Sequence, residues 1–225
     1  MRKLLDNLGL KLAFILSWIF FRNKPAEVVF DEVYRHNIWR DKESVSGPGS
    51  NLRETAILRT QLPKLLKQYS IASILDLPCG DFNWMRMLDL DGITYIGGDI
   101  VEAIVIENQT KYHQKNVVFK KINLLEDKLP KVDLILCRDC LVHFSYKDIH
   151  RALEQIKNSG STYLLTTTYP EKKNKDIVTG GWRPLNLNSA PFLLPKPEAI
   201  IPEGCKEING SNNDKSLGLW SIYDW

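Results

Sequence analysis

The sequence predicts an α/β fold built on a mostly parallel sheet that helices cover on both faces. The first observation is that short apolar runs alternate with amphipathic stretches through the middle of the 225-residue chain. The second is that residues 132–137 are apolar almost throughout, which is typical of a central parallel strand buried on both sides. Strands that alternate with helices in this way imply parallel pairing through crossover connections.

Periodicity and turn residues give the bounds of the individual elements. The expected strands are residues 73–77, 94–98, 117–121, 132–137, 162–168 and 216–223. The expected helices are residues 26–40, 53–69, 101–113 and 146–159, with a short helix or turn at 82–90. Pro63 is expected to kink the second helix or to mark its boundary. The stretch 170–202 is too long for a plain connection, so we expect it to have a function.

Composition limits the class of protein. The chain is 44% hydrophobic and 25% charged, as globular proteins are, and its length suits one domain with additions. A net charge of +3 with only short basic runs argues against nucleic-acid binding. Cys79 and Cys137 lie in apolar runs, as buried free thiols do, which favours a reducing, cytoplasmic location.

Residues 1–24 differ from the rest of the chain. Basic residues flank residues 8–21, which are apolar except for Lys11 and Ser17. This run is shorter than the ~20 residues that a membrane-spanning helix needs, and no small-residue cleavage site follows it. Two interpretations stay open, namely an interfacial anchor on the cytoplasmic membrane surface and a helix that packs on the domain or on a second copy.

Polar residues and a glycine follow the first two expected strands. Asp76 and Gly80 come at the end of residues 73–77, and Asp99 comes directly after residues 94–98. Ligands of open parallel sheets bind beyond the carboxyl ends of the strands, where an acidic residue can accept both hydroxyls of a ribose. A glycine there permits a tight turn and close approach of a ligand. The alternative is that the two aspartates cap the helices that follow them.

The segment Ile-Leu-Asp-Leu-Pro-Cys-Gly-Asp at residues 74–81 resembles the first motif of Rossmann-like, class I S-adenosylmethionine-dependent methyltransferases. Residues 95–100 resemble their second motif, and residues 132–143 resemble their fourth. The resemblance implies a doubly wound, mostly parallel seven-stranded sheet with an antiparallel last strand, plus N-terminal helices. It also implies transfer of a methyl group from S-adenosylmethionine to an acceptor.

The resemblance implies a cofactor site at the strand ends, with methionine over Gly80, ribose at Asp99 and adenine beside Asn123 and Leu124. The expected cofactor-binding residues are Asp76, Pro78, Gly80, Asp99, Ile100, Asn123, Leu124 and Arg138. The sequence departs from the family pattern at three positions. Pro78 and Phe82 stand where glycines are usual, and Asn123 stands where aspartate is commoner.

Methyl transfer from a sulfonium depends mainly on alignment, and a base is needed only if the acceptor must lose a proton. His143 follows the expected strand 132–137 by a few residues, so we predict that it is the catalytic base. Asp139 is the second predicted catalytic residue, and Tyr169 is a further alternative at a neighbouring strand end. A purely structural role for His143 stays open.

The sequence divides into an apolar N-terminal helix at residues 1–24, a helical lid at residues 25–70 and the cofactor-binding domain at residues 71–225. Trp39 and residues 44–50 resemble a segment of a little-characterised methyltransferase-like group, in which it would fold over the cofactor. Arg53 would then pair with the methionine carboxylate. A surface loop capped by Ser50 is the alternative.

The remaining expectations concern metals and acceptors. Cys137 and Cys140 form a CxxC pair close to His143, but no second pair exists, so we expect no metal site. The acceptor is expected to be a small molecule, a glycan or a lipid-linked compound. A protein methyltransferase and a non-catalytic binding module with the same fold stay open as alternatives, and the missing GxGxxG argues against a nicotinamide enzyme.

Overall fold

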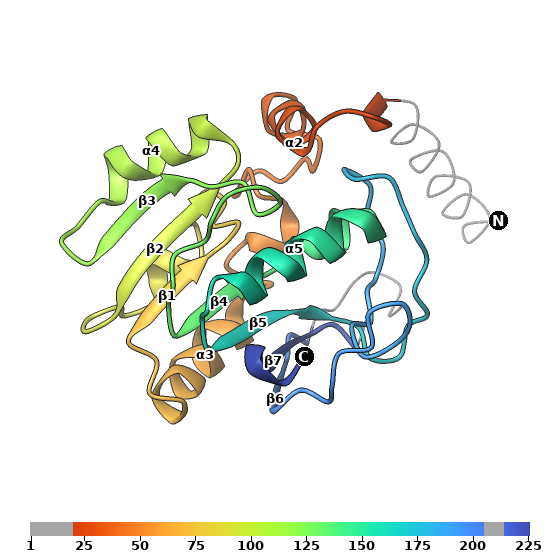
Figure 1. Cartoon of the computed structure of the whole chain (residues 1–225). Coiled ribbons are helices and arrows are strands. Elements are labelled where there is room, and N and C mark those ends of the chain that lie inside the picture. Colours follow the sequence, from red (N-terminus) through yellow and green to blue (C-terminus); the bar gives the residue numbers. More distant parts are fainter. Residues whose placement is uncertain (1–19, 205–213) are drawn as a thin grey trace.

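The computed structural model describes residues 20–204 and 214–225. Within that part of the chain, seven strands form one sheet in the order β3-β2-β1-β4-β5-β7-β6 (Figure 1). The strands are β1 (Ser73–Asp76), β2 (Thr94–Asp99), β3 (Val117–Lys121), β4 (Leu134–Cys137), β5 (Tyr163–Thr168), β6 (Ala199–Pro202) and β7 (Ser216–Ser221). The first five are parallel, and β7 runs antiparallel to both of its neighbours. The predicted sheet, with its antiparallel last strand, is therefore confirmed.

The helices cover the sheet and its carboxyl end. They are α2 (Ala26–Arg35), α3 (Ala56–Gln68), α4 (Glu102–Tyr112) and α5 (Tyr146–Asn158). At the start of α5 the Ser145 hydroxyl accepts a hydrogen bond from the Asp148 amide at 3.2 Å, which satisfies one free donor of the first turn. Pro63 lies inside α3, which continues past it to Gln68. Between β1 and β2, the short helix or turn expected at residues 82–90 is a 3₁₀ turn at Met85–Met87.

Strand β6 was not predicted from the sequence. It falls at the end of the stretch 170–202, has four residues and ends at Pro202. Its partner within the sheet is β7, against which Ala199 pairs with Leu219. So short an edge strand has too few residues for a visible alternation, and its position is set by tertiary pairing rather than by local propensity.

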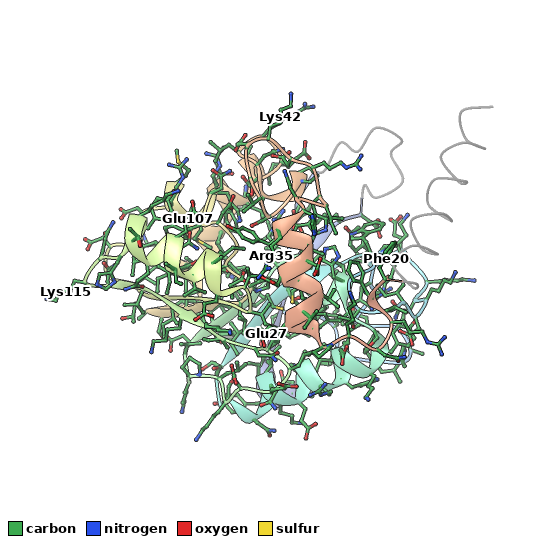
Figure 2. All side chains as sticks on the ribbon, turned by 90° about the horizontal axis from the view of Figure 1, so that it is seen from above. Phe20, Glu27, Arg35, Lys42, Glu107 and Lys115 are labelled. Carbon is green, nitrogen blue, oxygen red and sulfur yellow. The ribbon has the colours of Figure 1, made fainter. Side chains whose placement is uncertain are left out.

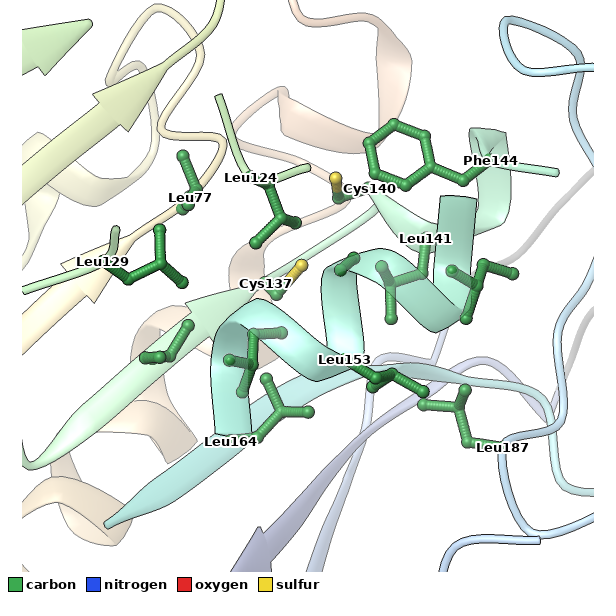
Figure 3. Packing of buried hydrophobic residues seen from close by; sticks show 14 of the residues in the cluster. Leu77, Leu124, Leu129, Cys137, Cys140, Leu141, Phe144, Leu153, Leu164 and Leu187 are labelled. Atoms are coloured by element: carbon green, nitrogen blue, oxygen red, sulfur yellow. The ribbon is translucent and has the colours of Figure 1, made fainter. Parts of the chain in front are cut away.

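Two layers of apolar side chains cover the two faces of the sheet. Leu75 and Ile135 pack in the layer under α5, whereas Ile74 and Leu134 pack in the layer that includes α3. Figure 3 shows the first layer, in which Leu164 of β5 lies with side chains of α5. Because successive residues face opposite layers and both layers are buried, β4 is apolar throughout and β1 is apolar at its two central residues.

Helix α2 lies over the carboxyl end of the sheet. Lys121, the last residue of β3, pairs with Glu27 of α2 at 2.7 Å and with Glu102 of α4 at 3.6 Å. Figure 2, seen from above, shows α2 between Glu27 and Arg35 beside α4. By contrast, α3 packs against one face of the sheet through Leu58 and Leu62. Of the two helices in residues 25–70, α2 therefore lies over the carboxyl end of the sheet, and α3 does not.

The predicted N-terminal anchor lies outside the described residues except for residues 20–24, so it stays a prediction. Among the described residues, no helix has the length and apolar character needed to cross a bilayer.

Candidate active site

A pocket lies at the carboxyl end of the sheet. The ends of β1, β2 and β4 form one side of it, and the other side comes from α2 and residues 39–50. All eight residues predicted to bind the cofactor line this pocket, and so do both predicted catalytic residues. The opposite wall consists of Phe30, Val33, Tyr34, Trp39, Val45, Ser46 and Ser50. The structure thus brings the ten predicted residues to one place, and their individual roles stay predictions.

Gly80 lies in the turn that follows β1 and lines the pocket. Its φ of +54° lies in the left-handed region, and its amide donates to Asp99 Oδ2 at 3.1 Å. Its carbonyl oxygen accepts from Asn108 Nδ2 of α4 at 2.7 Å. A Cβ at this position would lie 2.1 Å from Ser46 Oγ. Glycine is therefore required here both by the backbone conformation and by the segment that covers the turn.

Phe82 explains how the turn keeps its shape without the usual third glycine. Its φ of +57° is also left-handed, a conformation that normally costs a residue with a side chain about 1–2 kcal/mol. The Phe82 ring packs against Tyr95, Tyr112 and Phe119, with centroids 5.1 to 5.4 Å apart. We infer that this aromatic packing offsets the backbone strain.

Asp76 and Asp99 are both buried, with exposed fractions of 3% and 4%. Asp76 Oδ2 accepts from the Tyr95 hydroxyl at 2.7 Å. Burial raises the pKa of Asp76 to about 7, against the opposing effects of Tyr95 and Arg138. Burial likewise raises the pKa of Asp99 to about 6, although the amides of Val101 and Gly80 donate to its carboxylate.

The Asp99 geometry bears on the two interpretations of this residue. Its Oδ1 accepts from the amide of Val101, the residue that precedes α4, at 2.9 Å. This contact lies before the helix and is not a helix cap, because the N-cap residue is Val101 and no side chain caps the first turn of α4. Each carboxylate oxygen has a second lone pair, so the same side chain can also accept a ligand hydroxyl. The hydrogen bond to Val101 and ribose binding are therefore compatible at Asp99.

We name residues 44–50 the strap, because hydrogen bonds fasten them across the Gly80 turn. Asp81 accepts from the Ser44 hydroxyl and from the Val45 amide, both at 3.0 Å. The Ser46 hydroxyl accepts from the Asp81 amide at 3.1 Å. At the other end of the strap, Arg138 Nη2 donates to the Gly49 carbonyl oxygen at 2.8 Å. The strap is thereby held at both ends of the pocket.

His143 lines the pocket on a 3₁₀ turn at Leu141–His143 after β4. Its Nδ1 lies 2.8 Å from the Gly181 carbonyl oxygen. A carbonyl oxygen only accepts, so Nδ1 holds the ring proton and Nε2 keeps a lone pair. Burial lowers the pKa of His143, although Gly181 and Asp139 oppose this, so the ring is neutral near pH 7. The Trp39 ring packs against it, with centroids 5.2 Å apart.

Arg138 and Asp139 complete the inner wall. The Arg138 guanidinium lies over the Trp84 ring, 5.6 Å from its centroid, and Nη1 is 3.2 Å from Asp139 Oδ2. Asp139 Oδ2 also lies 2.7 Å from Lys215 Nζ. Burial favours a raised pKa for Asp139, but Lys215 and Arg138 outweigh it and hold the pKa well below its usual range. Asp139 is therefore ionised at neutral pH.

Asn123 and Leu124 line the pocket beyond β3. Asn123 Oδ1 accepts from the Leu125 amide at 3.0 Å, and its Nδ2 donates to Glu126 at 3.2 Å. An amide oxygen can accept two hydrogen bonds, so Asn123 can still meet a donor from a ligand. Leu124 is buried and contributes an apolar surface next to it.

Known proteins match this chain in structure. No protein-family model matches the sequence, and no curated protein matches it. Among solved structures, one match is human N-acetylserotonin methyltransferase in complex with S-adenosylmethionine, with a TM-score of 0.59 and 15% identity over 87% of this chain. This chain spans only 59% of the length of that protein.

Two further structures match over more of their own length. The methyltransferase domain of bacterial CtHen1-C has a TM-score of 0.52 and 10% identity, over 76% of this chain and 98% of that one. Magnesium protoporphyrin IX methyltransferase from Synechocystis PCC 6803 with bound S-adenosylmethionine has a TM-score of 0.50 and 13% identity, over 71% and 83%.

The fold is that of class I S-adenosylmethionine-dependent methyltransferases. Open parallel sheets generally bind ligands beyond the carboxyl ends of their strands, and the pocket lies at the carboxyl ends of β1, β2 and β4. At these low identities the likeness establishes the fold and leaves the activity and the acceptor to other arguments.

Some residues that the sequence pointed to lie away from the pocket of this methyltransferase fold. The Arg53 side chain is 82% exposed, pairs with Glu54 at 3.8 Å and does not line the pocket. Tyr169 is buried in the layer under α5 and is not among the lining residues. These positions argue against direct cofactor or acceptor contact by either residue.

The CxxC cysteines are buried free thiols, as Figure 3 shows for Cys137 and Cys140 in the layer under α5. Cys140 also lines the pocket. Across residues 20–204 and 214–225, no group of three His, Cys, Asp or Glu side chains is arranged to hold a metal ion.

Sequence reasoning missed several residues that build the site. Asp81 fastens the strap, Trp84 packs under Arg138, and Tyr95 donates to Asp76. Glu203 and Lys215 pair with Arg138 and Asp139 from the far edge of the sheet. Asp81 could have been noticed, since it directly follows Gly80. Glu203 and Lys215 have no local signal, because their partners lie more than 60 residues away in the chain.

Proposed function

We propose that this chain is an S-adenosylmethionine-dependent methyltransferase that acts on a small molecule, a glycan or a lipid-linked acceptor. The observation that supports this most is the meeting of Asp76, Gly80 and Asp99 at one pocket of the methyltransferase fold. The eight residues that the sequence predicts for cofactor binding and the two that it predicts for catalysis all line that pocket.

The residues of the pocket suit S-adenosylmethionine in charge and in polarity. The cofactor has a cationic sulfonium and ammonium group, and the pocket offers the carboxylates of Asp76 and Asp99. Ile100 and Leu124 give an apolar surface for a purine. Gly80 lets Ser46 of the strap lie directly against the turn, since a Cβ there would be 2.1 Å from Ser46 Oγ.

The bound cofactor would supply a methyl group that is already activated for transfer. Asp99 would hold the ribose hydroxyls, and the strap would exclude water from the pocket. His143 would take a proton at Nε2 from an acceptor hydroxyl or N–H, since its Nδ1 proton is held by Gly181. Asp139 has too low a pKa to be an effective base, so its carboxylate would orient the acceptor and favour the protonated form of His143.

The first prediction tests the cofactor. Titration calorimetry is expected to show that the protein binds S-adenosylmethionine and S-adenosylhomocysteine, and that Asp99→Asn weakens both by about 10–100-fold through loss of charged hydrogen bonds. Asp89→Asn is the matched control, because Asp89 also accepts from the amide two residues later but is exposed and outside the pocket. Absence of binding to the wild-type protein at millimolar cofactor would overturn the proposal.

A non-catalytic binding module of the same fold is the second candidate. Pro78 and Phe82, which replace two glycines of the usual loop, favour it. Incubation with S-adenosylmethionine and fractionated metabolite, lipid and protein extracts separates the candidates. An enzyme forms S-adenosylhomocysteine with at least one extract, and the fraction that receives labelled methyl groups distinguishes a protein acceptor from a small one. A binding module forms none with any extract.

We further propose that residues 1–24 contact an anionic cytoplasmic membrane surface. Phe20 is 58% exposed at the start of the described chain, and its neighbour Phe21 packs against Gly180. Aromatic and basic residues are typical of interfacial helices. The second prediction is that anionic liposomes float the full chain, but not Phe14→Asp/Trp18→Asp. Val28→Asp, which changes an exposed apolar residue of α2, is the control. Equal flotation of all three proteins would contradict membrane contact by this segment.

A further inference from the structure

Four charged side chains form a closed ring of alternating sign behind the pocket. Arg138 Nη2 lies 2.6 Å from Glu203 Oε2, and Arg138 Nη1 lies 3.2 Å from Asp139 Oδ2. Lys215 Nζ closes the ring, 2.7 Å from Asp139 Oδ2 and 3.2 Å from Glu203 Oε2. Two positive and two negative charges therefore balance within one cluster.

The ring is largely removed from water. The exposed side-chain fractions are 4% for Arg138, 0% for Glu203, 7% for Lys215 and 25% for Asp139. A buried charge that loses its partner is strongly destabilised, so each member restricts the geometry of the others. Arg138 and Asp139 line the pocket, whereas Glu203 and Lys215 do not. Glu203 and Lys215 can therefore act on the pocket only through Arg138 and Asp139.

The ring also touches the strap. Arg138 Nη2, which pairs with Glu203, donates to the Gly49 carbonyl oxygen at 2.8 Å. Gly49 lies so close to the ring that a Cβ there would be 3.0 Å from Asp139 Oδ2. The orientation of the guanidinium therefore decides whether this end of the strap keeps its hydrogen bond.

We propose that Glu203 and Lys215 are positioning residues of the active site, which orient Arg138 and Asp139 and so keep the strap closed over the pocket. The proposal rests on the proposed function for its consequence on cofactor binding. Its consequence for the strap is independent, because the contact between Arg138 and Gly49 exists within the chain itself. The two consequences are measured separately.

Lys215→Met gives the first test, because methionine keeps an unbranched side chain but has no charge. Hydrogen exchange at the amides of Ser50 and Asn51, which donate to Gly47 and Pro48 within the strap region, is expected to accelerate about tenfold with loss of the charged contacts. The dissociation constant for S-adenosylmethionine is expected to rise by a similar factor. Lys215→Arg should return both quantities to within about threefold of wild type, since it keeps the charge.

Lys111→Met is the matched control, because Lys111 also pairs with a glutamate but on the exposed surface of α4. It is expected to change neither quantity. Glu203→Gln/Lys215→Met is a second variant that keeps the cluster neutral, in case a single unpaired charge prevents folding. Its strap amides are expected to exchange as fast as those of Lys215→Met, because Arg138 has lost Glu203.

Wild-type exchange and affinity in Lys215→Met would overturn the proposal, and so would failure of Lys215→Arg to restore them. Uniform acceleration of exchange in β7 and the strap alike would also overturn it, because that pattern indicates general destabilisation. If the wild-type protein binds neither S-adenosylmethionine nor S-adenosylhomocysteine, the proposed function fails. The ring is then judged by exchange at the strap alone.

Discussion

Gly80→Ala is expected to weaken S-adenosylmethionine binding by about a hundredfold, because the new Cβ collides with the strap and forces the Gly80 turn to shift. The Cβ would lie 2.1 Å from Ser46 Oγ and 3.0 Å from Ser46 Cβ, and the first of these distances is far shorter than any real contact. The φ of +54° adds a strain of about 1–2 kcal/mol for alanine. Titration calorimetry measures the affinity, and thermal unfolding measures the stability.

Two variants separate the collision from the backbone strain. Gly92 has a φ of +73°, and nothing lies within 4 Å of the place that a Cβ would take, so Gly92→Ala introduces strain alone. It should lower the free energy of unfolding by about 1 kcal/mol and leave cofactor affinity unchanged. Ser46→Gly combined with Gly80→Ala removes the colliding side chain and should recover at least part of the affinity. Wild-type affinity in Gly80→Ala would contradict the proposed position of the cofactor.

Cofactor affinity is expected to rise steeply with pH between about 5 and 7.5. The pKa of Asp76 is about 7 and that of Asp99 about 6 in the free protein, mainly because both are buried. A cationic cofactor favours the ionised carboxylates, so binding releases their protons. Affinity then rises by about tenfold per pH unit for each proton released, below the pKa of that group. Calorimetry in buffers of different ionisation enthalpy counts these protons directly.

The stability of the free protein changes with pH in the opposite direction to the cofactor affinity. The pKa values of Asp76 and Asp99 in the folded protein are raised above the unfolded value of about 3.8. The stability that comes from their protonated forms is therefore fully present below pH ~4 and is lost as the pH rises through about 6 and 7. The increase in melting temperature caused by S-adenosylmethionine should therefore grow with pH. In Asp99→Asn, cofactor binding should release one proton fewer than in the wild-type protein. In Tyr95→Phe, the curve of affinity against pH should shift to higher pH, because the Tyr95 hydroxyl lowers the pKa of Asp76. An affinity independent of pH from 5.5 to 8 would contradict this account.

Six of the seven strands in the described residues could be predicted, because each of them has a local signal. Residues 134–137 are buried on both faces and are therefore apolar throughout, and the last strand, Ser216–Ser221, is buried along most of its length in the same way. Strand β6 could not be predicted, because four residues that end at a proline give no periodicity. The end of α2 at Arg35 was placed five residues too late, since His36 to Arg40 continue the apolar spacing without forming helix.

The pocket floor could be predicted for a related reason. Asp76, Gly80 and Asp99 each lie at or just beyond the end of a strand, and parallel strands bring their carboxyl ends to the same edge. The fastening of the strap could not be predicted, since Asp81 and Ser44 are 37 residues apart and nothing local links them. The ring of charges is harder still to predict from the sequence, because its members come from three separate segments of the chain. Each member is also a residue of a type that is usually exposed at the surface.

The ring of charges also affects the order in which the protein can be completed during synthesis. The strap and the Gly80 turn precede Arg138 in the chain, but Arg138 gains its glutamate partner and the neighbouring Lys215 only after Glu203 and Lys215 have been synthesised. Until then, the inner wall of the pocket holds a buried guanidinium without its glutamate, which is unfavourable. A ligand that binds only the finished pocket cannot stabilise the growing chain. The inner wall of the pocket is thus completed only after Glu203 and Lys215 have been synthesised, when β1 to β5 are already present.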